Sequence, residues 1–166
     1  MTTPPLPLDG ADELVAAAWI GSITGLSPAM VGEQLPPDVN PDGTVAAWVS
    51  TGFVTVAVVG GTPDALLPVN RAVMQVDCWA TVPGSNKPPW PRAAALAAVI
   101  RRATWDRYRI SRPLALSVNG VAYPSAVVRS AYLATTFRRI YDDQGDYARF
   151  QADLALDWVT VNDRLD

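Results

Sequence analysis

The sequence predicts an α+β fold: a single domain with a mainly antiparallel β-sheet and two or three helices packed on it. Apolar and polar residues alternate along 71–82 and 147–161, which is typical of strands with one buried face. An alanine-rich segment at 92–105 lies between them and has the composition of a helix. No repeat or linker divides the 166 residues, so we expect one domain over 1–166.

The first forty residues predict an arm, a helix and a loop. Residues 1–10 are proline-rich and are expected to form a flexible N-terminal arm. Asp12 is placed to cap a helix that ends near residue 20, and Pro28 suits the first position of one further helical turn. Prolines and polar residues make 35–43 a loop.

The next segments change to strand periodicity. Residues 45–49 and 53–59 are rich in β-formers, and Ser50-Thr51-Gly52 has the length of a hairpin turn between them. Residues 60–64 read as another turn. In the strand at 71–82, one face is predicted to point into the core: Ala72, Met74, Val76, Cys78, Ala80 and Val82.

The second half predicts a helix and two hairpins. After a loop at 83–91, the helix at 92–105 has an apolar stripe of Leu96, Val99, Ile100 and Ala103. Asn119-Gly120 between two β-rich segments is a strong hairpin signal. Residues 126–141 and 147–161 are expected to form a long hairpin with an acidic turn at 142–146.

The composition argues against an enzyme. The chain has no histidine, the commonest general acid or base, and its single cysteine cannot form an intrachain disulfide. Gly60-Gly61-Thr62 lacks the Gly-Lys of a phosphate-binding loop, and the aspartates at 142–146 lack calcium-loop spacing. We therefore expect no catalytic residues, no cofactor and no metal site.

The start of the chain has no basic residue before a short apolar stretch, and no run of about 20 apolar residues follows. We expect synthesis in the cytoplasm and no membrane partner.

Charge is sparse and unevenly distributed. Charged residues make up 17% of the chain, against about 25% in typical domains. Residues 1–83 carry eight acids and one arginine, whereas 84–166 carry twelve bases and eight acids, so the halves have charges of −7 and +4. Two interpretations stay open: the halves intermix within one fold, which charge alone favours, or an acidic face meets a basic face of a neighbouring copy.

Arginines are concentrated in the second half, near Trp105 and Tyr108. Such a patch is conceivable as a nucleic-acid surface. The pI of about 4.8 and the adjacent aspartates favour ion pairs at a subunit interface instead.

One series of motifs resembles a known family. A Gly60-Gly61 turn is followed by Asn70-Arg71 and by a strand that reads Met-Gln-Val-Asp-Cys-Trp-Ala from residue 74 to 80. The alanine-rich helix and the C-terminal strand pair come next, so the similarity covers roughly residues 44–161. This order resembles the tail terminator (tail completion) proteins of long-tailed, siphovirus-type bacteriophages.

The resemblance implies a virion structural protein without catalytic residues. Such a subunit forms a hexameric ring that caps the tail tube, stops its elongation and joins the tail to the head–neck connector. Its expected partners are other copies of itself, the tail tube protein and the connector protein, with the genome passing through the ring. Another head-completion or connector subunit, or a small nucleic-acid-binding domain, is the alternative.

A ring needs apolar and aromatic anchors and complementary charges at its subunit contacts. The candidates for these contacts are Trp48, Trp79, Trp90, Arg101, Arg102, Arg138 and Arg139. We expect Trp90→Ala or Arg102→Ala to weaken ring formation more than it destabilises the monomer.

Overall fold

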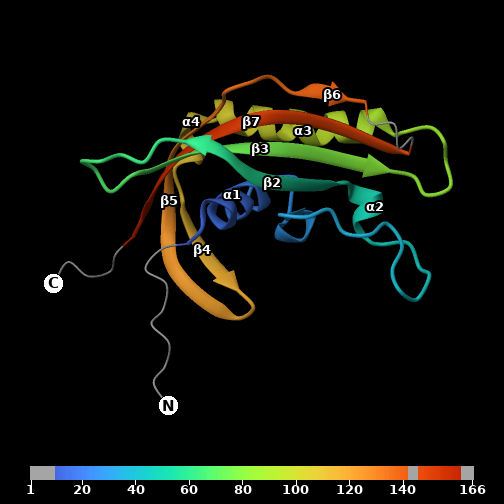
Figure 1. The fold of residues 1–166 in the computed structure, drawn as a ribbon, viewed down its shortest axis with the longest axis horizontal. Helices are drawn as coiled ribbons and strands as arrows, with labels where there is room; N and C mark the ends of the chain where they lie inside the picture. Colours follow the sequence, from blue (N-terminus) through green and yellow to red (C-terminus); the bar gives the residue numbers. More distant parts are fainter. Residues whose placement is uncertain (1–9, 142–145, 162–166) are drawn as a thin grey trace, which may run out of the picture.

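The fold is α+β, as predicted, in a computed structural model that describes residues 10–141 and 146–161. Within these residues seven strands form one curled, mostly antiparallel sheet, in the order β1-β2-β3-β7-β5-β4, with β6 paired to β7 (Figure 1). The strands are β1 Val31–Gly32, β2 Phe53–Gly61, β3 Asn70–Thr81, β4 Pro113–Val118, β5 Val121–Leu133, β6 Arg138–Ile140 and β7 Tyr147–Thr160. The helices are α1 Asp12–Gly21, the 3-10 turn η1 Pro28–Met30, α2 Trp48–Thr51, α3 Trp90–Trp105 and α4 Arg107–Ile110.

The two long helices share one face of the sheet. α1 contacts β2 and β4, whereas α3 contacts β3 and β7, and both contribute to a single core cluster. Figure 1 shows α1 between β2 and the descending β4–β5 hairpin, with α3 running along the sheet. The largest fully buried side chains come from both helices and from the central strands, and include Trp19, Ile20, Met74, Ile100, Leu154 and Trp158.

Strands β3 and β7 form the centre of the sheet. They pair antiparallel over the whole length of β3, with Cys78 opposite Phe150. The predicted inward face of β3 is buried from Ala72 to Ala80; Val82, beyond the strand, is 40% exposed. β3 comes from the acidic half and β7 from the basic half, so the two halves intermix within one fold.

The predicted hairpin at 45–59 is wrong in its first strand. Residues 48–51 form the short helix α2, and only the second segment is a strand. The helical turn places Trp48 and Val49 together in a small buried cluster with Phe53. Gly52 then has a φ of 82°, and a side chain there would lie 2.6 Å from Leu96 Cδ1, so glycine is needed at this junction.

The ends of both long helices differ from the prediction. Ala11, not Asp12, is the N-cap residue of α1. The carboxylate of Asp12 instead accepts a hydrogen bond from Trp158 Nε1 at 2.7 Å, because the helix start lies against the end of β7. α3 begins at Trp90, which the sequence placed in the preceding loop.

The Asn119-Gly120 hairpin is confirmed. Asn119 has a φ of 49° and Gly120 of 78°, as expected for the two central residues of a tight hairpin turn. β5 runs through Pro124 to Leu133 and pairs with β7, with a register shift between Val128 and Ser130. β6 then pairs with the start of β7, so the predicted strand pair forms, but residues 134–137 interrupt its first strand. The acidic turn lies outside the described residues except for Asp146, and so does the arm except for Gly10.

Candidate assembly interface

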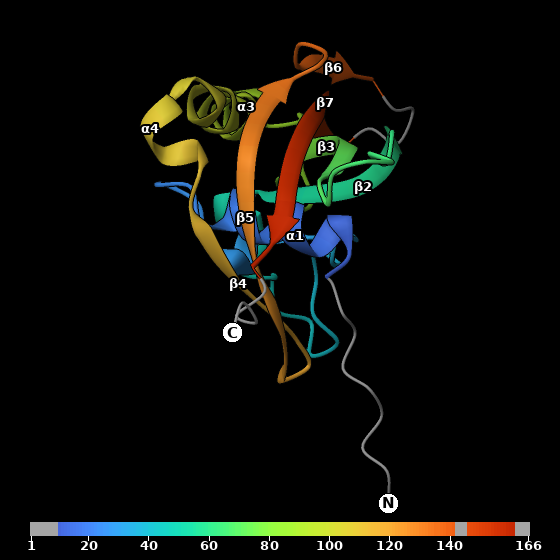
Figure 2. The ribbon, with the colours of Figure 1, turned by 90° about the vertical axis from the view of Figure 1, so that its left-hand side faces the viewer.

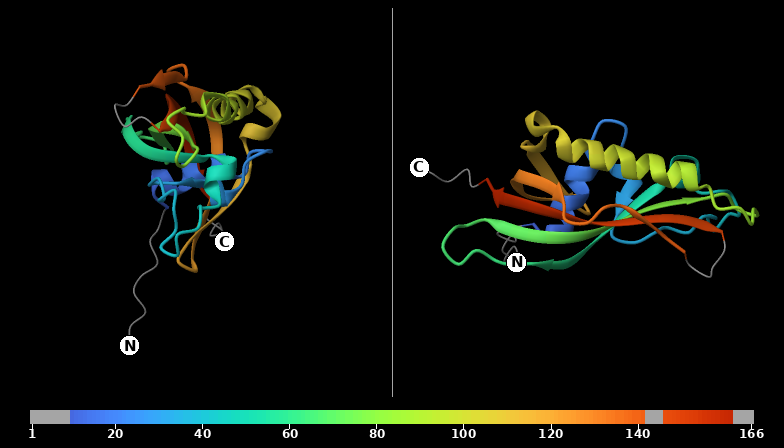
Figure 3. Two further views of the ribbon diagram at one scale, coloured as in Figure 1. Left: turned by 90° about the vertical axis from the view of Figure 1, so that its right-hand side faces the viewer. Right: turned by 90° about the horizontal axis from the view of Figure 1, so that it is seen from above.

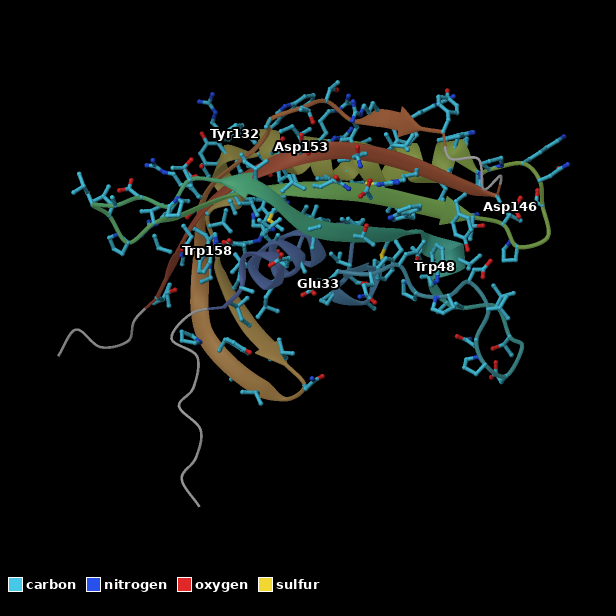
Figure 4. The ribbon with its side chains drawn as sticks, viewed as in Figure 1. Glu33, Trp48, Tyr132, Asp146, Asp153 and Trp158 are labelled. Carbon is cyan, nitrogen blue, oxygen red and sulfur yellow. The ribbon has the colours of Figure 1, made fainter. Side chains whose placement is uncertain are left out.

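The predicted interface residues lie at separate places on the molecule. Trp48 is only 6% exposed and belongs to an aromatic cluster at one end of the sheet, opposite Trp158 (Figure 4). Its ring stacks on Tyr147 at 6.4 Å, and its Nε1 donates a hydrogen bond to the Pro37 carbonyl at 3.0 Å. Trp48 therefore anchors the preceding loop to the sheet and offers little surface to a neighbour.

Trp79 belongs to a polar network on the outer face of the sheet. The Arg149 guanidinium lies 4.7 Å above the Trp79 ring, and Trp79 Nε1 donates to Thr55 Oγ1 at 2.9 Å. Arg149 Nε also donates to Asp77 Oδ1 at 2.8 Å, and the side-chain amides of Gln75 and Gln151 donate to the same carboxylate. Asp77, which is 5% exposed, is thus a compensated buried charge, so this motif has a structural role.

Trp90 joins the start of α3 to strands β6 and β7. Its ring packs against Tyr141 and Phe150, and the Arg139 guanidinium lies 5.1 Å from the ring centroid. Replacing Trp90 by alanine therefore also removes contacts within the monomer. Arg138 is exposed and donates to Gln151 Oε1 at 3.3 Å.

The last turns of α3 combine exposed cations and aromatic rings. The Arg101 guanidinium lies 5.5 Å over the Trp105 ring, which is 69% exposed, and Tyr108 in α4 is 98% exposed. Arg102 is exposed, and the ion pairs found among the described residues do not include it. Arg102 is therefore available to a partner.

A groove of about 480 Å³ lies beside Arg102, between α3, α4 and the turn that follows α1; we call it the α3–α4 groove. Its apolar lining consists of Ile23, Ala95, Ala98, Val99 and Ala103, and its charged lining of Arg102, Asp106, Arg109 and Arg112. Val99 and Ala103 belong to the predicted core stripe of the helix. They are only half-buried, because the core-facing stripe is Ala93, Leu96, Ala97 and Ile100.

Arg112 holds one wall of the α3–α4 groove in place. Its guanidinium lies 5.2 Å from the Trp19 ring, donates to Ser22 Oγ and to the Trp19 carbonyl at 2.8 and 2.9 Å, and bonds the Arg109 carbonyl. Partial burial lowers the pKa of Arg112, although Asp106 opposes that shift. The groove is thus a fixed surface with a volume within the roughly 300–1,000 Å³ of binding clefts.

A second exposed apolar feature is the loop between β2 and β3, residues 62–69, which we call the leucine loop. Leu66 is 92% exposed and Leu67 57%. Asp64 Oδ1 accepts hydrogen bonds from both of their backbone N–H groups, at 2.9 and 3.0 Å, and Asp64 Oδ2 lies 3.4 Å from Arg71. These hydrogen bonds lower the pKa of the Asp64 carboxyl group. The carboxylate is therefore ionised at neutral pH and accepts both hydrogen bonds.

The leucine loop and the α3–α4 groove were not predicted from the sequence. The Leu66-Leu67-Pro68 run after a Gly-Gly turn was a usable signal for the loop. The groove had none, because its lining comes from segments about 70 residues apart in the chain. Figure 2 shows α3 and α4 beside β4 and β5, with the β2–β3 connection away from them toward the other end of the strand order, and Figure 3 shows this connection extending beyond the ends of β2 and β3.

The remaining chemistry of the described residues is limited. Burial and the charge of Asp77 raise the pKa of the Cys78 thiol, so it is not an activated nucleophile. Within residues 10–141 and 146–161, no three histidine, cysteine or carboxylate side chains gather as metal ligands would. None of the helices in this part of the chain is long and apolar enough to cross a bilayer.

Neither a protein-family model nor a curated protein matches the chain. The interface residues named above therefore rest on the geometry of this molecule.

Proposed function

We propose that the protein is a virion structural subunit: a tail terminator that forms a hexameric ring, caps the tail tube and joins it to the head–neck connector. The observation that carries the proposal is the pair of unlike apolar surfaces, the leucine loop that joins β2 to β3 and the α3–α4 groove. A cyclic ring is built from a heterologous contact, in which each subunit presents two different surfaces.

The sequence resemblance supports the same function through the places that its motifs occupy. The Gly60-Gly61 pair ends β2 beside the leucine loop, and the Asp77–Trp79 motif builds the outer network of β3. The alanine-rich helix α3 supplies most of the apolar lining of the groove. The motifs thus organise a scaffold and its contact surfaces.

The test is electron microscopy of the purified protein in negative stain, alone and mixed with tail tubes, together with native mass spectrometry. We expect rings of six with a central hole, and particles of the same diameter at the tube end. Dodecamers would favour a connector subunit instead. Absence of the protein from purified virions, measured by mass spectrometry, would contradict a structural role of either kind.

A nucleic-acid-binding domain is the second candidate, because Arg101 and Arg107 are exposed beside the Trp105 and Tyr108 rings. The geometry weakens it: Arg109 pairs with Asp106 at 3.6 Å, and the Arg112 guanidinium is bonded within the protein. A salt-dependent shift of DNA mobility at physiological ionic strength would favour this candidate; unchanged mobility would argue against it.

A further inference from the structure

The β4–β5 hairpin carries its core-facing apolar surface beyond the core. Leu116 pairs with Tyr123, and Val118 pairs with Val121 next to the turn. Residues two apart on a strand share a face, so these four side chains lie on the face that packs against the core. Leu116 is only 3% exposed, whereas Val118 is 41% and Val121 46% exposed. We call Val118, Val121 and the half-buried Tyr123 the hairpin apolar face.

The hairpin projects below the other strands and is uncharged (Figures 1 and 2). Residues 113–128 contain no aspartate, glutamate, lysine or arginine. Apolar surface gains free energy when it is removed from water, and a charged partner would lose its hydration here without finding a countercharge. The hairpin apolar face therefore suits an apolar, uncharged segment.

The N-terminal arm, residues 1–9, joins the described chain at this face. Gly10 lies against Leu116, since a Cβ at Gly10 would be 2.9 Å from Leu116 Cδ1. The two strand residues from Leu116 to Val118 span about 7 Å. The four residues from Leu6 to Gly10 can span up to about 14 Å. Leu6 and Leu8 are thus within reach of the exposed valines without crossing the sheet.

The composition of the arm matches the hairpin apolar face. Leu6 and Leu8 are apolar, and Asp9 is the only charged side chain of residues 1–9. In an extended segment residues two apart point the same way, so both leucines can face the hairpin together. Three of the nine residues are prolines, which reduce the conformational entropy that a segment loses when it becomes ordered.

We propose that the N-terminal arm folds back on its own subunit and covers the hairpin apolar face, with Leu6 and Leu8 packed against the two exposed valines. The cover is reversible, because the entropy cost of ordering the arm opposes the burial of a few apolar side chains. The inference goes beyond the tail terminator function and does not depend on it.

Maleimide labelling measures whether the face is covered. Val121→Cys places a thiol on the hairpin apolar face, and Ala122→Cys places one on the opposite, exposed face of the same strand. Cys78 is buried and should not react. Replacing Leu6 and Leu8 by serine adds no charge that would alter the pKa of the thiol. We expect it to speed the labelling of Val121→Cys by at least about threefold, because the reagent reaches only the uncovered form.

The same two serine substitutions should leave the labelling of Ala122→Cys unchanged. If they did not speed the labelling of Val121→Cys, or sped both variants equally, the arm would not cover this face and the proposal would be overturned.

Disulfide trapping identifies the subunit that supplies the arm. A chain with Leu8→Cys and Val121→Cys is oxidised at low protein concentration, and its products are separated by mass without reductant. We expect a cross-linked monomer, in a yield several times that of the matched pair Leu8→Cys and Ala122→Cys. Disulfide-linked dimers would assign the arm to a neighbouring copy and overturn the proposal, as would equal monomer yields from the two pairs.

Discussion

Asp77 is a buried charge on the outer face of the sheet, where solvent would be the default neighbour. Its carboxylate accepts from the Arg149 guanidinium and from the side-chain amides of Gln75 and Gln151. The Arg149 side chain, 20% exposed, also covers the Trp79 ring. Four side chains from β3 and β7 therefore form one compensated unit, and removing a single member leaves the others unsatisfied.

We expect Arg149→Met to lower the free energy of unfolding by about 3–5 kcal/mol, because Asp77 would remain buried without its countercharge. Urea denaturation followed by tryptophan fluorescence measures the change. The control is Arg138→Met, which removes an exposed arginine from the neighbouring strand and should cost less than about 1 kcal/mol. The double variant Asp77→Leu/Arg149→Met should recover much of the loss; equal destabilisation by the two single variants would contradict this account.

At the scale of elements, the residues at the end of β2 set where this strand stops and where the exposed leucine loop begins. β2 extends beyond the core after Val56. Val58 is 41% exposed, and the register with β3 shifts between Val58 and Gly60. Gly61 then takes a left-handed φ and passes directly against Arg71 of β3. This close approach sets the start of the leucine loop.

Gly61→Ala is expected to destabilise the protein by at least about 1–2 kcal/mol, because an L-residue at this φ is strained and its Cβ meets the Arg71 carbonyl. Thermal denaturation checks the loss. Gly60→Ala is the matched control: a Cβ there would meet Val73 Cβ at an ordinary 3.8 Å, so its effect should be small. A similar loss from the two substitutions would show that Gly61 imposes no special conformation.

At the scale of the whole molecule, helices, sheet and groove depend on one core. α1 and α3 meet β3 and β7 around Cys78, Met74 and Leu154, all fully buried. Burial of Cys78, reinforced by Asp77, raises the pKa of its thiol, so the folded state keeps a proton that the unfolded chain releases above about pH 8.5. The free energy of unfolding therefore depends on pH through the Cys78 thiol.

The sign of this linkage gives a test. Cys78 contributes its full stability below about pH 8.5, and that contribution falls by up to about 1.4 kcal/mol per unit as the pH rises further. Urea denaturation between pH 8 and 9.5 should show this fall in the wild type, below the titration range of Tyr147, whose pKa burial also raises. Cys78→Ala should be less stable throughout but flatter with pH. If the free energy of unfolding changed equally with pH in the wild type and in Cys78→Ala, Cys78 would not be the cause of the pH dependence.

Local sequence patterns predicted the elements that depend on one segment. The alternation along 147–161 gave β7 with its buried face, and Asn119-Gly120 gave the hairpin because both residues accept a positive φ. The prediction of a strand at 45–49 was wrong because burial in an aromatic cluster overrode the strand propensity of this segment. The prediction that Asp12 caps the first helix was wrong because its carboxylate accepts a hydrogen bond from Trp158, which lies 146 residues away in the chain.

The sequence by itself determined the α+β class, the inward face of the central strands, the hairpin at Asn119-Gly120 and the absence of histidine chemistry, since each follows from periodicity, turn residues or composition. Only the tertiary structure decided which tryptophans are buried, which arginines are exposed, and that a groove forms beside α3 while two leucines of the β2–β3 loop stay exposed. These properties depend on contacts between segments far apart in the chain, and local patterns carry no record of such contacts.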